Sequence, residues 1–236
     1  MEPQGISGEQ VAQLLASVAE QLKSPLTNIA RQAELVSAAD QPGDWRAVHT
    51  QATVALALVE SYLLGLQLLH EQESLVLEPV SISSLLVDSA HELEPYARQH
   101  GVMLELHVAG RYGPVMAHRA GLKAALLSLG YALIESHTKE GKRKSLTIAT
   151  HRTPHGIVAG VYGEYEQLSA GAWRTALELC GRAQQPFAAV SGTTTAGVFV
   201  ANTILQAMHT HLRVGHHLKQ TGLAATLQPS QQLQLV

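Results

Sequence analysis

Two long helical patterns, separated by one short break, constrain the fold of this chain more than any other feature. From Gln10 to about Ala38 the apolar residues recur every three or four positions, which is the spacing of one stripe along a helix. The segment Gln41-Pro42-Gly43-Asp44 interrupts this pattern, and Asp44 stands where it would cap a second helix. Two long helices with a short connection predict an antiparallel hairpin.

The second helical pattern has more apolar surface than one partner helix can cover. Leu56, Leu58 and Leu63 widen the stripe that begins at Val48. Burial of each large aliphatic side chain contributes about 2 kcal/mol, so leaving this surface in water would be strongly unfavourable. The simplest arrangement is a homodimer in which two hairpins form a four-helix bundle. We therefore expect residues 1–76 to form a helical dimerisation domain.

The periodicity changes after Glu78-Pro79, which predicts a second domain over residues 77–236. Alternating apolar residues predict a strand over 102–108, and two further strands flank a hairpin turn at 153–156. Helices are predicted near 84–100, 121–136, 173–180 and 197–209, with short strands near 115–116, 212–214 and 223–227. This mixture predicts an α+β fold, in which a mixed sheet carries helices on one face as an α/β sandwich.

Composition and charge exclude several classes of protein. Hydrophobic residues make up 46% of the chain and charged residues 15%, which is typical of a globular protein. The net charge is −3 and the best basic run is only Lys142-Arg143-Lys144, so no nucleic-acid partner is expected. Cys180 is the single cysteine, which excludes an internal disulfide and fits a reducing compartment.

The sequence also predicts a cytoplasmic protein without membrane insertion. Its first ten residues have neither the basic start nor the apolar core of a signal peptide. The most apolar stretch, Val54 to Leu69, contains Glu60 and is shorter than the ~20 residues that a bilayer span needs.

One local sequence points to a known family. The segment from Ala19 to Thr27, AEQLKSPLT, resembles the Ser-His-Glu-Leu-Arg-Thr-Pro-Leu box of the sensor histidine kinases of two-component signalling. Pro25 lies inside a strongly periodic helix, where a proline costs about 3 kcal/mol and kinks the helix. In the family this kink follows the phosphorylated histidine. Weaker similarities, in the same order as in the family, are found at 115–122, 122–136, 185–187 and 192–201.

The resemblance covers nearly the whole chain and implies a dimerisation and phosphotransfer hairpin followed by a GHKL-type ATPase-like domain. The phosphoacceptor histidine of the family aligns with Glu20, and the neighbouring base aligns with Gln21. Phosphotransfer from ATP needs a neutral imidazole as nucleophile and a carboxylate as base. Neither residue supplies that chemistry, so no catalytic residue is expected here.

The resemblance also implies that most nucleotide-binding residues of the family are replaced. Their positions carry Ser128, Ala132, Gly163, Glu164, Gly192, Thr195 and Gly197, of which only Gly192 and Gly197 keep the family's residue, the glycines of the lid turn. Ser128 and Ala132 replace two asparagines, one of which holds Mg²⁺, and alanine offers no oxygen to a hard cation. Gly163 follows the strand that should end in the adenine-binding aspartate, with Glu164 as an off-register substitute. Thr195 occupies a glycine site in a turn whose glycines let backbone N–H groups approach phosphate. We therefore expect neither ATP nor Mg²⁺ as a cofactor.

These departures indicate a pseudo-histidine kinase that acts by protein interaction. Its partner would be a response regulator or a true histidine kinase. The expected docking surface on the hairpin comprises Glu20, Lys23, Ser24, Thr27 and Asn28.

Three alternatives remain at this stage. The first is an active atypical kinase or phosphotransferase in which His118 or another histidine takes the phosphate. The second is a response-regulator phosphatase, in which the Ser24 hydroxyl and the Gln21 amide orient water. The third is a dimeric scaffold unrelated to phosphate.

Two other residue types were considered as functional sites. The pairs His209-x-His211 and His216-His217 could contribute zinc ligands, but no cysteine or acidic residue has a matching spacing, so no metal is expected. Trp45 and Trp173 are interpreted as packing residues.

Overall fold

The computed structural model describes a large part of the chain. The described residues are 22–23, 25–35, 45–71, 76–108, 110, 112–136, 144–165, 168–179 and 195–230. Several predicted positions lie outside them, namely Glu20, Gln21, Ser24, Cys180 and Gly192, and the side chain of Thr195 also lies outside.

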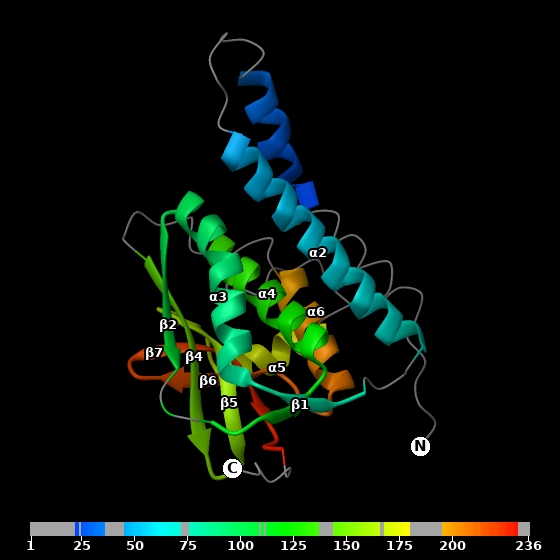
Figure 1. The fold of residues 1–236 in the computed structure, drawn as a ribbon, viewed down its shortest axis with the longest axis vertical. Helices are drawn as coiled ribbons and strands as arrows, with labels where there is room; N and C mark the ends of the chain where they lie inside the picture. The colour runs from blue at the N-terminus through cyan, green and yellow to red at the C-terminus, as the bar shows by residue number, and fades with distance from the viewer. Residues whose placement is uncertain are drawn as a thin grey trace.

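The first part of the described chain is helical, as the apolar periodicity predicts. Residues 25–35 are helical and lie alongside α2, which spans Trp45–Glu71 (Figure 1). Pro25 is buried within the first of these helices. The α2 helix is longer than its most apolar stretch, and Trp45–Leu68 is long and apolar enough to cross a membrane by length and composition alone. A helix that packs against the core of a globular protein can have the same length and apolar composition.

A five-stranded mixed sheet forms the second part. Its strands lie in the order β2 (Val102–Val108), β4 (Lys144–Thr153), β5 (Gly156–Gly163), β7 (Gln220–Leu227) and β6 (Arg213–His217). The β2 strand is parallel to β4, and the other neighbours are antiparallel. The predicted hairpin is the β4–β5 pair. Sequence reasoning missed β1 (Glu78–Val80), which pairs with β3 (Val115–Ala117) in a separate two-stranded sheet.

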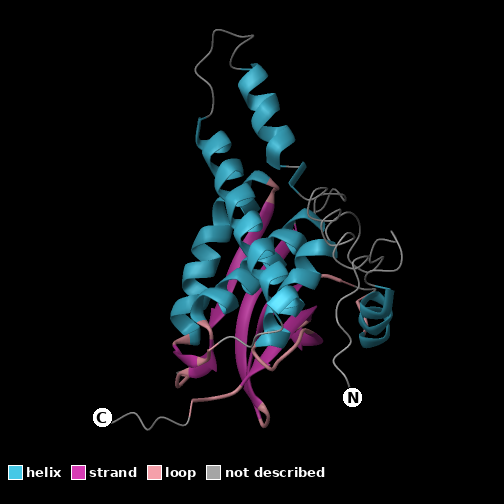
Figure 2. Ribbon diagram, turned by 90° about the vertical axis from the view of Figure 1, so that its right-hand side faces the viewer, coloured by secondary structure: helices cyan, strands magenta, loops and turns pink. Residues whose placement is uncertain are grey.

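Helices cover one face of the sheet (Figure 2), which confirms the predicted α+β sandwich. They are α3 (Ile82–Gln99), α4 (Arg119–Ser136), α5 (Ala170–Leu179) and α6 (Thr195–Ala207). The Ser81 side chain caps α3 by accepting a hydrogen bond from the Ser84 N–H. Gly130 lets α3 approach α4, because a Cβ atom at this position would lie 2.4 Å from Leu93 Cδ1.

The helical hairpin shares its core with the sandwich. Val54, Leu58 and Tyr62 of α2 are at most 2% exposed and belong to the same cluster as the inner residues of α4 and α6. A Cβ atom on Gly65 would lie 3.4 Å from Val200 Cγ1, so α2 and α6 are in close contact. One face of α2 is therefore docked on the sandwich. The predicted domain boundary falls between α2 and β1 and remains a prediction.

Candidate functional site

The α4 helix carries the first pair of residues predicted for a degenerate nucleotide site. Ser128 and Ala132 are four residues apart, so they lie on one face of the helix. Both are fully buried, at 0% exposure. The Ser128 hydroxyl has no hydrogen-bond partner among the described residues. Together they present one hydroxyl and one methyl group.

The end of β5 carries the second pair. Gly163 is buried and pairs with Thr221 of β7, whereas Glu164 is exposed. The Tyr162 side chain packs near His217, with 5.4 Å between ring centroids. Neither Gly163 nor Glu164 therefore places a carboxylate in the buried part of the helical layer.

A tyrosine that sequence reasoning missed connects this strand end to α4. Tyr165 donates a hydrogen bond from its hydroxyl to the Leu133 carbonyl at 3.4 Å, and its hydroxyl lies 3.3 Å from Ser136 Oγ. Burial raises the pKa of Tyr165 above its usual range. The ring thus bridges the end of β5 and the last turns of α4.

The start of α6 carries the remaining predicted glycine within the described residues. Gly197 is buried in the first turn of α6, which packs against α4. The space that Leu129 of α4, Leu205 of α6 and Ala225 of β7 enclose is about 10 Å³. A cavity of this size holds at most one water molecule. This part of the helical layer is closely packed against the sheet.

A partly buried carboxyl, that of Glu135, lies at the junction of α2, α3 and α4. Tyr96 donates a hydrogen bond from its hydroxyl to Glu135 Oε1 at 2.7 Å. Tyr131 packs edge-on against Tyr96, with 5.2 Å between ring centroids. Burial raises the pKa of Glu135, and the hydrogen bond from Tyr96 opposes that shift. The pKa of Tyr62 on α2 is raised by burial and also by the nearby charge of Glu135.

Sequence reasoning missed this Glu135 cluster because its members are far apart in the chain. The only local signal is a carboxylate near the end of an otherwise apolar helix.

His118, the alternative phosphate acceptor, has a capping role. Its Nδ1 atom accepts a hydrogen bond from the Gly121 N–H at 3.0 Å, at the start of α4. That nitrogen satisfies one of the N–H groups that a helix start leaves unpaired.

Histidines also gather on the sheet, although not as the sequence pairs. His107 Nδ1 of β2 and His217 Nε2 of β6 are 3.2 Å apart, and the His151 ring of β4 stacks on His217 at 5.9 Å. Desolvation lowers the pKa of His217, as do the charges of His107 and His151. His216 instead contacts Thr221 Oγ1 at 3.2 Å. Within the described ranges, no group of three metal-ligating side chains is arranged to hold a metal ion.

The described part of the predicted docking surface is accessible. Lys23 and Thr27 are exposed on the first helix, and Asn28 is partly exposed.

The two tryptophans differ from each other. Trp173 is 5% exposed and donates a hydrogen bond from Nε1 to the Leu212 carbonyl at 2.9 Å, which confirms its packing role. Trp45 is 63% exposed, so the prediction that it packs in the core is wrong. It lies at the first position of α2, where the helix projects beyond the sandwich.

A helical hairpin docked on a mixed five-stranded sandwich is the fold of sensor histidine kinases, as solved structures confirm. The histidine kinase AdeS of Acinetobacter baumannii matches with a TM-score of 0.52 and 14% identity, over 88% of this chain and 96% of AdeS. Histidine kinase ThkA in complex with response regulator TrrA matches with a TM-score of 0.57 and 12% identity, over 96% of this chain and 63% of that chain.

Full-length ShkA in complex with AMPPNP matches with a TM-score of 0.55 and 17% identity. The match covers 93% of this chain and 46% of ShkA. At these identities the likeness establishes the fold. No protein-family model matches the chain, and no curated protein matches it.

Proposed function

We propose that this protein is a pseudo-histidine kinase of two-component signalling, which acts through protein contacts without binding ATP or phosphorylating a histidine. The observation that carries the proposal is the composition of the α4 face. Mg²⁺ prefers several oxygen ligands in octahedral geometry. The two positions provide one buried hydroxyl, Ser128, and one methyl group, Ala132. These residues do not fit the magnesium ion that accompanies ATP in this fold.

The adenine-binding end of the site supports the same proposal. The adenine amine needs a hydrogen-bond acceptor at the end of β5. The two residues at that position are Gly163, which has no side chain, and Glu164, which is exposed. At the phosphoacceptor position, glutamate has replaced histidine at Glu20.

The proposed partner is a response regulator that docks on the hairpin around residues 20–28. Exposed Lys23 and Thr27 support this surface. Among the structures of the same fold, ThkA is in complex with a response regulator. Docking of a response regulator does not need phosphotransfer chemistry. The protein would therefore act on signalling by binding the regulator or by competing with another kinase for it.

The proposed assembly is a cytoplasmic homodimer. Leu56, Val59 and Leu63 on the outer face of α2 are 36% to 64% exposed, and Leu26 and Leu35 of the preceding helix are exposed by more than half. Covering these side chains with a second hairpin would remove apolar surface from water at about 25 cal/mol per Å². Leu56→Glu with Leu63→Glu should convert the dimer to a monomer in sedimentation analysis.

Nucleotide titration tests the central proposal. ATP and AMPPNP are added to the full chain with and without Mg²⁺, and the melting temperature and heat of binding are measured. A ligand at a hundred times its Kd adds about 2.7 kcal/mol to the free energy of unfolding. We expect no shift, whereas an active histidine kinase such as AdeS should shift in the same assay. A magnesium-dependent shift, or phosphate labelling from ATP that a single histidine substitution removes, would contradict the proposal.

A further inference from the structure

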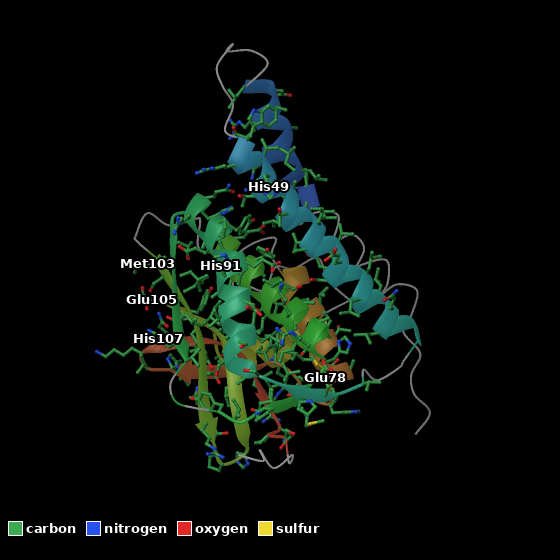
Figure 3. All side chains as sticks on the ribbon, viewed as in Figure 1. His49, Glu78, His91, Met103, Glu105 and His107 are labelled. Atoms are coloured by element: carbon green, nitrogen blue, oxygen red, sulfur yellow. The ribbon has the colours of Figure 1, made fainter. Side chains whose placement is uncertain are left out.

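A surface groove lies between the start of α2 and the second half of α3, away from the predicted nucleotide site. Its volume is about 700 Å³. Its walls include Trp45, Arg46 and His49 from α2, and His91, Glu94 and Arg98 from α3. Figure 3 labels His49 on α2 and His91 on α3. We call this surface the α2–α3 groove.

A hydrogen bond joins the two helices next to the α2–α3 groove. Gln51 of α2 donates it to Gln99 of α3, and Gln51 is only 5% exposed. Each of these residues is one position along the chain from a groove residue, Thr50 and Arg98. The helices that form the groove walls are therefore in direct contact beside it.

The charge of the α2–α3 groove is opposite to that of the whole protein. The chain carries a net charge of −3. With histidine taken as neutral in both cases, the walls carry two arginines, Arg46 and Arg98, and one acid, Glu94, for a net charge of +1. Arg46, His49 and His91 are exposed. Arg98 pairs with Glu94 at 3.0 Å, but its side chain remains 78% exposed.

The α2–α3 groove also contains an apolar contact surface. Trp45 is 63% exposed beside this basic rim, although burying an indole ring is strongly favourable. Tryptophan and arginine are the residue types most enriched among the residues that dominate binding energy at protein interfaces. The groove is open to solvent along the helices, unlike the enclosed sites that bury most of a small molecule.

We propose that the α2–α3 groove binds an acidic segment of a partner protein. Carboxylates of this segment pair with Arg46 and Arg98, and an apolar residue between them packs on Trp45. Charge complementarity selects an acidic partner over a basic one. Glu94 competes with the segment for Arg98, so it weakens binding and favours segments of high negative charge. This inference rests on the proposed function only in taking the protein to act through protein contacts.

The test uses a fluorescein-labelled peptide of alternating glutamate and leucine, a counterpart with glutamine in place of glutamate, and the full chain. Fluorescence anisotropy gives Kd, and the emission of Trp45 gives a second readout because Trp173 is buried.

Arg46→Gln and Arg98→Gln should each weaken binding about two- to fivefold. Trp45→Ala should weaken it about tenfold. Glu94→Gln should tighten binding about two- to fivefold, since it frees Arg98.

Arg152→Gln, which makes the same charge change at an exposed position on β4, is the matched control and should leave Kd unchanged. These positions are exposed or partly exposed, so each variant should fold, which its melting curve verifies. The proposal is overturned if the acidic peptide does not bind, if the glutamine peptide binds equally well, or if Arg152→Gln has the same effect as Arg46→Gln. None of these readouts involves nucleotide, so the result is independent of the nucleotide titration.

Discussion

The helical side of the sheet and the side that carries the histidines both contain a cluster of titratable groups, but the surroundings of the two clusters differ. On the helical side, Glu135 is partly buried between helices, and its pKa is raised because burial penalises its charge. On the sheet, His217 is also partly buried, and its pKa is lowered by desolvation and by two neighbouring histidines. Both shifts favour the neutral form in the folded protein. The Glu135 cluster joins helices of the main apolar core, whereas the histidine cluster joins strands of the sheet, so we expect the larger effect on the free energy of unfolding at Glu135.

The largest expected effect tests whether α2 and α4 belong to one folding unit on the helical side. Leu58 of α2 and Leu133 of α4 are both fully buried. Truncation of either residue to alanine should lower the free energy of unfolding by about 2–5 kcal/mol, because apolar contacts are lost and a cavity remains. Urea denaturation of both variants measures this change. Val87→Ala, at a 49% exposed position of α3 outside the proposed dimer interface, is the control and should change the free energy of unfolding by less than about 0.5 kcal/mol. A Leu58→Ala variant as stable as the control would show that α2 is not docked.

The next effect concerns the Glu135 carboxyl. Burial raises the pKa of Glu135 in the folded protein above its ordinary value. Its contribution to stability is therefore complete below the unfolded pKa and is lost as the pH rises through the folded pKa. Glu135→Gln keeps an acceptor for Tyr96 and removes the charge. We expect this variant to become more stable than the natural protein as the pH rises from about 4 to about 8. Denaturation curves across that range measure the difference, and Glu60→Gln, at an exposed position of α2, should show none.

The smallest effect concerns the histidine cluster on the sheet, His107, His151 and His217. The folded pKa of His217 is lowered from 6.5, so its contribution to stability is present above the unfolded pKa and is lost as the pH falls through the folded pKa. His217→Gln should reduce the loss of stability on acidification, which denaturation curves across the pH range measure. His216→Gln, on the same strand but with its hydrogen bond to Thr221, is the matched control. Equal behaviour of the two variants would show that the His107–His217 contact does not matter.

The apolar pattern predicted the architecture well because secondary structure leaves a periodic trace in the sequence. The stripe from Val48 onward predicted α2, and the alternation over 102–108 predicted β2. The short strand β1 was missed because three residues carry no readable alternation. Five of the predicted nucleotide-site positions lie within the described residues, namely Ser128, Ala132, Gly163, Glu164 and Gly197. The burial of four of them and the exposure of Glu164 depend on how the elements pack.

The sequence by itself determined which side chains are available, including a carboxylate at Glu20 and a methyl group at Ala132, and it determined where most helices and strands form. Only the tertiary structure decided that Glu135 meets Tyr62 and Tyr96, that His217 meets His107 across the sheet, and that Trp45 remains exposed beside two arginines. The physical reason is that periodicity reports contacts within one element. Contacts between residues far apart in the chain depend on how the elements pack.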